Sequence, residues 1–164
     1  PNQGPLRVIC VGRLIERKGQ HHLIEAIKLL ADEGVDVELQ LVGTGDSLGD
    51  YTRLAQRLGV ANRVRFVGYV PRESIAQHFA TAHVFALPSY NEGMAIAALE
   101  AMGAGLPVIL TRTGGTDELV QEGVNGLTFD WADVPALAGH IRRLAADRAL
   151  ARQMGAASRT RAQR

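Results

Sequence analysis

Short apolar runs alternate with amphipathic stretches along the chain, and most of the runs end at a glycine or proline. This pattern is typical of buried strands, which we expect at 6–11, 37–42, 64–67, 83–87, 106–110 and 127–129. Apolar residues at helical spacing predict helices at 20–30, 48–58, 71–81, 94–102, 116–121, 133–146 and from 148 onward. Strand and helix therefore alternate, which predicts an α/β, Rossmann-like fold: a parallel sheet with helices on both faces.

The composition fits one globular domain and gives no sign of a nucleic-acid partner. The chain has 164 residues, 46% of them apolar, and a formal net charge of +1, whereas nucleic-acid-binding domains usually carry a clear basic excess. No apolar run approaches the ~20 residues that a membrane span needs. The single cysteine, Cys10, lies in an apolar run, which indicates a buried thiol and a reducing, cytoplasmic compartment.

Cations and glycines follow the first two expected strands, where sheets of this kind bind their ligands. Arg13, Arg17 and Lys18 precede a helix, and cations beside free backbone amides form phosphate sites. The loop is neither a Walker loop nor a Gly-x-Gly-x-x-Gly dinucleotide fingerprint. Three solvated surface cations remain the alternative. Gly43 and Gly45 follow the second strand and would allow a ligand to approach, although an ordinary turn has the same composition.

Two glutamates frame the helix expected at 94–102. Glu92 precedes it and Glu100 follows eight residues later, which is about 12 Å if the segment is helical. That is roughly the length of a sugar diphosphate, whose phosphates would face the free amides of Gly93, Met94, Ala95, Ile96 and Ala97. A glutamate among Ala, Leu and Met is costly to bury without a partner. A binding role is therefore favoured over a capping Glu92 and a stray Glu100.

At these residues the sequence resembles the C-terminal domain of the family-four retaining glycosyltransferases of the GT-B fold, the glycosyl transferases group 1. Four motifs carry the resemblance in the family's order, from Leu6 to about Arg152. They are Gly12-Arg13-Leu14 with Lys18-Gly19, Val67-Gly68-Tyr69-Val70-Pro71, Pro88-Ser89 with Glu92 and Glu100, and Gly114-Gly115 with Glu118. The resemblance implies a UDP or GDP sugar as donor and transfer with retention of configuration, without a metal or an organic cofactor.

The resemblance also implies a role for each site residue by its position. Arg13 and Lys18 match the pair that holds the donor diphosphate, and Glu92 matches the glutamate that touches the transferred sugar. These three are the expected catalytic residues. Glu100 matches the glutamate that binds the ribose. The remaining matches are Tyr69 and Val70 beside the nucleobase, and Gly12 and Gly43 near the ligand.

The sequence departs from the family at two residues and in its extent. Ala95 stands where many relatives have a second glycine, and Asp117 where a proline is common, which leaves the fit of the sugar open. The family's N-terminal domain, which holds the acceptor, has no counterpart, and the opening residues 1–5 resemble an interdomain linker. We therefore expect residues 1–164 to form a single nucleotide-sugar-binding domain, the C-terminal half of a two-domain hexosyltransferase-like enzyme. Its partner would be its own N-terminal domain, and alone it would be inactive.

Other functions fit the sequence less well than nucleotide-sugar binding or stay open. A Rossmann-type oxidoreductase needs the missing dinucleotide fingerprint, whereas a non-catalytic nucleotide-binding or regulatory module stays open. The five histidines have no zinc-ligand spacing, so no metal site is expected. The arginine-rich stretch from Arg142 onward could contact anionic lipid at the inner face of the membrane, although a solvated helix is favoured.

Overall fold

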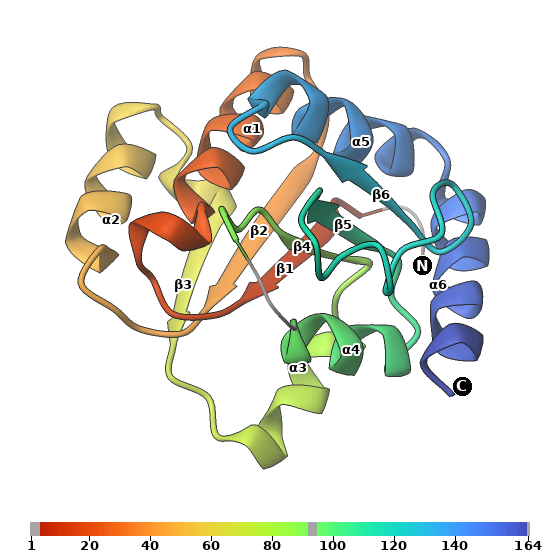
Figure 1. The fold of residues 1–164 in the computed structure, drawn as a ribbon. Coiled ribbons are helices and arrows are strands. Elements are labelled where there is room, and N and C mark those ends of the chain that lie inside the picture. The colour runs from red at the N-terminus through yellow and green to blue at the C-terminus, as the bar shows by residue number, and fades with distance from the viewer. Residues whose placement is uncertain (1–3, 92–94, 164) are drawn as a thin grey trace.

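Six parallel strands form one sheet in the computed structural model, which describes residues 4–91 and 95–163. The strand order is β3-β2-β1-β4-β5-β6 (Figure 1). The strands are β1 (Leu6–Val11), β2 (Val37–Val42), β3 (Val64–Gly68), β4 (Val84–Leu87), β5 (Val108–Thr111) and β6 (Gly126–Phe129). The order reverses between β1 and β4, because the chain adds β2 and β3 on one side of β1 before it crosses back. This reversal marks the expected ligand site of such a sheet.

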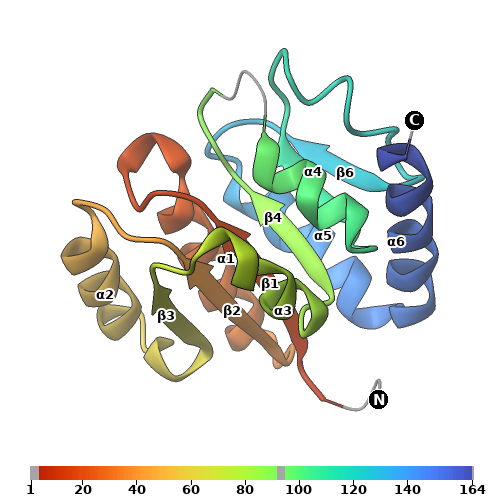
Figure 2. The same cartoon turned by 90° about the horizontal axis from the view of Figure 1, so that it is seen from below.

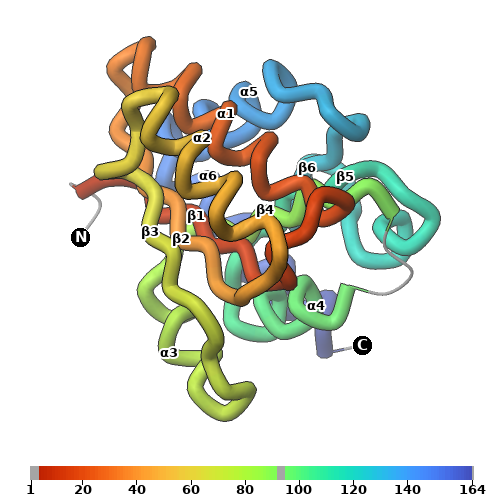
Figure 3. Tube along the Cα trace, turned by 90° about the vertical axis from the view of Figure 1, so that its left-hand side faces the viewer, coloured from red at the N-terminus to blue at the C-terminus, as the bar shows by residue number. Residues whose placement is uncertain are grey.

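Helices cover both faces of the sheet, as the alternating pattern predicts. On one face lie α1 (Gln20–Asp32), α2 (Leu48–Arg57) and α5 (Val134–Ala146), and on the other lie α3 (Ile75–Ala80) and α4 (Ile96–Gly103) (Figures 2 and 3). The last helix, α6 (Arg148–Ala162), packs against α4. Short 3₁₀ turns are η1 (Glu16–Lys18), η2 (Ala61–Arg63) and η3 (Arg72–Ser74). The expected Rossmann-like fold is confirmed.

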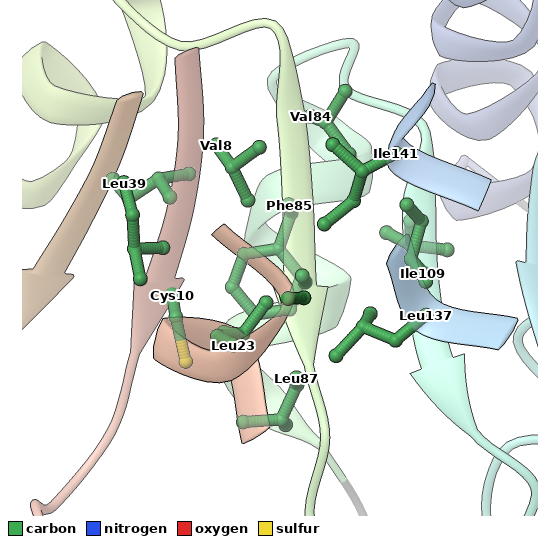
Figure 4. Packing of buried hydrophobic residues seen from close by; sticks show 14 of the residues in the cluster. Val8, Cys10, Leu23, Leu39, Val84, Phe85, Leu87, Ile109, Leu137 and Ile141 are labelled. Carbon is green, nitrogen blue, oxygen red and sulfur yellow. The ribbon is translucent and has the colours of Figure 1, made fainter. Parts of the chain in front are cut away.

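The core lies between the sheet and its two helical layers. Strand β4 is buried along its whole length, because a parallel strand covered on both faces must be apolar throughout rather than alternating. Leu23 of α1 and both Leu137 and Ile141 of α5 converge on strand residues such as Phe85 (Figure 4), and all four are fully buried. Cys10 is buried as well.

One expected helix is wrong, and three elements begin two or more residues later than predicted: β5, α4 and α3, which starts at Ile75 after the 3₁₀ turn η3. Residues 116–121 form turns, because the Thr116 hydroxyl bonds the Thr113 backbone and the Leu119 carbonyl accepts from the Asn125 and Arg161 side chains. These bonds hold the segment in turns, where a helix would use the carbonyls itself. Strand β5 begins at Val108, after Pro107, which has no N–H for a sheet ladder. Helix α4 begins at Ile96 rather than at Met94.

No helix within residues 4–91 and 95–163 is both long enough and apolar enough to cross a membrane. Arg142 and Arg143 lie on α5, and Arg148, Arg152, Arg159 and Arg161 lie on α6. Arg164 lies outside the described residues. The guanidinium of Arg142 forms two hydrogen bonds of 2.7 Å with the Glu33 carboxylate. The side chain of Arg161 donates to the carbonyls of Glu118 and Leu119 at 3.1 Å. Contact of this stretch with lipid stays a prediction.

Candidate functional site

The loops that follow β1 and β4 meet at the carboxyl edge of the sheet, at the reversal of strand order. The Tyr90 amide donates to the Arg17 carbonyl at 2.7 Å. Gly19 lies so close to the β4 loop that a Cβ on it would be 2.1 Å from the Pro88 carbonyl oxygen. Gly19 also has a left-handed backbone, with φ of 72°. The cationic segment and the segment leading to the glutamates, far apart in the sequence, are therefore in direct contact.

A buried glutamine fixes the backbone of the cationic loop. Gln20, the first residue of α1, is only 1% exposed. Its side-chain amide donates to the Arg13 carbonyl at 2.8 Å, and it lies 3.9 Å from the position that a Cβ would take on Gly12. The Arg13 side chain is exposed and that of Lys18 is half-buried. Gln20 was not predicted as a site residue from the sequence. The sequence shows it only as a polar residue at the start of a helix, which does not indicate its hydrogen bond to Arg13.

Gly43 is required by contacts inside the protein. Its φ is 133°, and a Cβ there would be 2.1 Å from the Gly12 carbonyl oxygen. Gly45 is crowded in the same way by the Leu14 backbone, at 2.3 Å. The glycines after β2 therefore allow two loops to touch, which explains them without a ligand. Their predicted proximity to the donor stays a prediction.

Helix α4 begins at the same edge, where the loop after β4 leads into it (Figure 2). Ala95 is buried and is the N-cap, and no hydrogen bond from its side chain caps the helix. The first helical residue, Ile96, is 53% exposed. The partial positive charge of a helix start favours an anion there.

Of the two predicted site glutamates, Glu92 and Glu100, the structure describes only Glu100. Glu92, Gly93 and Met94 lie outside the described residues. Ala95 has non-helical backbone angles of −89° and 85°, so the segment from Glu92 to Glu100 is not one continuous helix. The estimate of 12 Å between the two carboxylates therefore does not hold. Glu100 lies in the second turn of α4.

The Glu100 carboxylate has a partner on a neighbouring element. Its Oε2 lies 3.2 Å from Nη2 of Arg72 in η3, and its side chain is 32% exposed. The pair borders an open groove of about 640 Å³ that Glu73 and Phe79 also line. Tyr69, which is 76% exposed, and Val70 come shortly before η3 in the chain. Neither residue lines the groove, so the predicted place of Tyr69 and Val70 beside the nucleobase stays a prediction.

An aromatic cluster that the sequence pattern did not reveal supports the cationic loop. Trp131, from the loop before α5, contacts the Tyr90 ring edge-on at a centroid distance of 5.3 Å and the His22 ring at 4.6 Å. Its ring also lies 3.0 Å from where a Gly19 Cβ would be. Burial, and secondarily the charge of His21, lowers the pKa of His22 to about 4. His22 is therefore neutral near pH 7, and adds no charge to a phosphate site.

Within the described part of the chain, no group of three His, Cys, Asp or Glu side chains is close enough to hold a metal ion. Charged groups in the segments that follow the strands at the carboxyl edge include Arg13, Lys18 and the Glu100–Arg72 pair. Cations, a helix start and an exposed aromatic side chain suit a ligand that carries phosphates and a ring.

Comparisons with known proteins agree with this arrangement. The chain matches the family described as glycosyl transferases group 1 over residues 1–161. It is 40% identical over 159 residues to the GDP-mannose-dependent alpha-(1-6)-phosphatidylinositol monomannoside mannosyltransferase of Mycolicibacterium smegmatis, covering 93% of this chain and 42% of that protein. Sucrose-phosphate synthase from Thermosynechococcus elongatus has a TM-score of 0.89 at 35% identity, over 99% of this chain and 41% of that one.

A second solved structure, HepE of Anabaena in complex with UDP and glucose, has a TM-score of 0.90 at 30% identity, over 99% of this chain and 44% of that one. The chain thus spans about two-fifths of the length of the relatives it matches. The resemblance to GT-B glycosyltransferases is confirmed, and nothing in these matches favours an oxidoreductase. The chain belongs to the glycosyl transferases group 1 family.

Proposed function

We propose that the chain binds a nucleotide diphosphate sugar at the carboxyl edge of its sheet and supplies the donor half of a glycosyltransferase. The observation that carries this proposal is the contact between the loop of Arg13 and Lys18 and the loop that leads into α4. That contact brings two cations and a free helix start to one edge, as a diphosphate requires. The UDP and glucose named for HepE support the same ligand class.

Each group at this edge has a distinct task in the proposed reaction. Arg13, Lys18 and the amides at the start of α4 stabilise the negative charge that develops on the leaving diphosphate. Glu92 contacts the transferred sugar, and Glu100 accepts hydrogen bonds from the ribose hydroxyls. Transfer with retention of configuration, in the cytoplasm and without a metal, is part of the proposal. The nucleobase is open, since the names of relatives include GDP-mannose and those of structural neighbours include UDP.

The test of this proposal is the affinity of the chain for UDP and GDP. Losing one charge-assisted hydrogen bond costs about 1.5–3 kcal/mol, so we expect Arg13→Ala and Lys18→Ala each to weaken binding of the better diphosphate roughly tenfold or more. Calorimetric titration measures this directly. Lys28→Ala is the matched control, because Lys28 pairs with Asp32 near the other end of α1 and should leave the affinity unchanged. Equal affinity of the wild type and the Arg13→Ala, Lys18→Ala double variant would contradict the proposal.

The ribose assignment predicts that Glu100 discriminates a ribonucleotide from its 2′,3′-dideoxy analogue, which lacks both ribose hydroxyls. The hydrogen bonds from ribose hydroxyls to a carboxylate are charge-assisted, so Glu100→Gln should weaken UDP or GDP binding about tenfold while barely affecting the dideoxy analogue. Glu73→Gln, which changes another carboxylate at the same groove, should leave the discrimination intact. Glu92→Gln should matter only when the sugar is attached. If Glu100→Gln weakens both nucleotides equally, the carboxylate does not read the ribose.

A further inference from the structure

A second basic cluster lies at the amino edge of the sheet, opposite the donor edge. A groove of about 320 Å³ there is lined by Arg7, His83, Arg148 and Arg152, above a floor that includes Leu106 and Pro107. Arg7 is in β1 and His83 directly precedes β4. Because β1 and β4 are parallel neighbours, their amino ends lie side by side. Arg148 begins α6, and its side chain contacts Gly4, which precedes β1 in the chain.

The positive charge of this groove is only partly compensated within the described residues: the Asp36 carboxylate acts electrostatically on Arg148 but forms no ion pair with it there. No Asp or Glu lines it, and none of its three arginines forms an ion pair within residues 4–91 and 95–163. The nearby carboxylate of Asp36 is paired with Arg63 at 3.5 Å. Three guanidinium groups in one groove repel one another, and an anion between them would remove that repulsion.

The Arg148 side chain has buried donors without acceptors. One of its nitrogens, Nη2, donates to the Gly4 carbonyl at 2.6 Å. The other two, Nε and Nη1, are buried and have no hydrogen-bond partner within the described part of the chain. Buried donors are nearly always satisfied in proteins, and those that are not often mark the site of an ion. Two Arg148 donors next to the groove are therefore left without an acceptor among the described residues.

His83 adds a neutral donor to the three charges. Its Nδ1 accepts a hydrogen bond from the Arg7 amide at 2.9 Å. Burial, together with the charges of Arg7 and Arg148, lowers the pKa of His83 to about 4. The ring is therefore neutral at pH 7, and because Nδ1 accepts, the remaining proton is on Nε2. Arg7 and Arg148 act electrostatically on the His83 ring. The NMR resonances of that ring should therefore change when an anion binds in the groove.

We propose that this groove is a binding site for a phosphate group, either free phosphate or a phosphomonoester, separate from the donor site. Its three positive charges suit a phosphate dianion better than a single carboxylate, because guanidinium groups match phosphate oxygens in geometry and charge. The groove, at about 320 Å³, is larger than a phosphate ion. Leu106 and Pro107, which also line it, can contact the carbon part of a phosphomonoester.

The test is a titration of the intact chain with inorganic phosphate at pH 7.5, where the ion is mainly the dianion, followed by NMR at the His83 ring. We expect saturable shifts of the His83 resonances. In a separate pH titration with and without phosphate, the pKa of His83 should be higher with phosphate, because a bound phosphate anion offsets the charges of Arg7 and Arg148. Arg148→Gln should weaken phosphate binding at this reporter at least tenfold. Arg152→Gln serves as a second variant on the exposed side of the groove. Arg143→Gln, on the exposed side of α5, is the matched control and should change nothing.

The experiment also separates this site from the donor site and distinguishes two sources of phosphate. Lys18→Ala should leave the His83 response intact, and Arg148→Gln should leave UDP and GDP affinity intact, so either proposal can fail alone. Sedimentation with vesicles of phosphatidic acid in phosphatidylcholine tests a lipid headgroup as the source. Binding that Arg148→Gln abolishes would support that source, and a response to dissolved phosphate alone would support a soluble ligand. No His83 shift at 50 mM phosphate (about the weakest affinity worth testing), or equal shifts in the wild type and both arginine variants, would overturn the proposal.

Discussion

The chain alone should form no detectable glycoside from a nucleotide diphosphate sugar and an acceptor. Every site residue that we can assign serves the donor, and the chain covers only 42% of the Mycolicibacterium mannosyltransferase that it matches. Holding two reactants in one geometry is worth about 7–11 kcal/mol of the barrier. Without a surface that holds the acceptor beside the donor, we expect a rate at least about 10⁵-fold below that of a complete relative, with at most slow hydrolysis of the donor by water.

The measurement is product formation from GDP-mannose and from UDP-glucose over a panel of acceptors. The full-length Mycolicibacterium enzyme, with the substrates in its name, is the positive control for the assay. Calorimetric binding of UDP or GDP to the isolated chain, measured in the same samples, shows that its donor site is formed. Repeated turnover by the isolated chain, lost in Glu92→Ala and so not due to a contaminant, would show that the active site is complete within these 164 residues.

The strands of the sheet could be predicted from the sequence because they are buried on both faces. Such strands appear as uninterrupted apolar runs, and β1, β2 and β4 were each found within one residue of their observed limits. Amphipathic spacing likewise located α1 and α5. The error at 116–121 arose because side-chain bonds from Asn125 and Arg161, which local spacing does not encode, hold the segment in turns.

The candidate site could be predicted only where a motif carries its chemistry. Arg13, Lys18 and Glu100 stand in recognisable positions relative to strand ends. Gln20 and Trp131 do not, because their roles depend on which loops meet after the chain has folded. The hydrogen bond from Gln20 to the Arg13 carbonyl and the contacts of Trp131 with Tyr90 and His22 are tertiary. Among the residues at this edge, the glycines do indicate tertiary contacts in the sequence. Gly19 and Gly43 each lie against the backbone of another loop, where a larger residue would not fit.

Gly19→Ala should destabilise the protein and damage the donor site together. An alanine in the left-handed conformation, here φ of 72°, costs about 1–2 kcal/mol. Its Cβ would lie 2.1 Å from the Pro88 carbonyl oxygen and 3.0 Å from Trp131. Because backbone must move to relieve that contact, overpacking adds about 1–3 kcal/mol. We expect the free energy of unfolding to fall by about 2–5 kcal/mol in total, and diphosphate affinity to fall at least tenfold as Lys18 is displaced.

Gly59→Ala is the matched control for this change. Gly59 has nearly the same backbone angle, φ of 74°, but a Cβ there would have no heavy atom within 4 Å. It should therefore lose only the conformational part, about 1–2 kcal/mol, with unchanged affinity for UDP or GDP. Urea denaturation gives the free energies of unfolding, and calorimetry gives the affinities. The difference between the two variants isolates the contact of Gly19 with the β4 loop. If both variants lose the same free energy of unfolding, that contact is not tight in solution, and the two loops of the donor edge are not held together through Gly19.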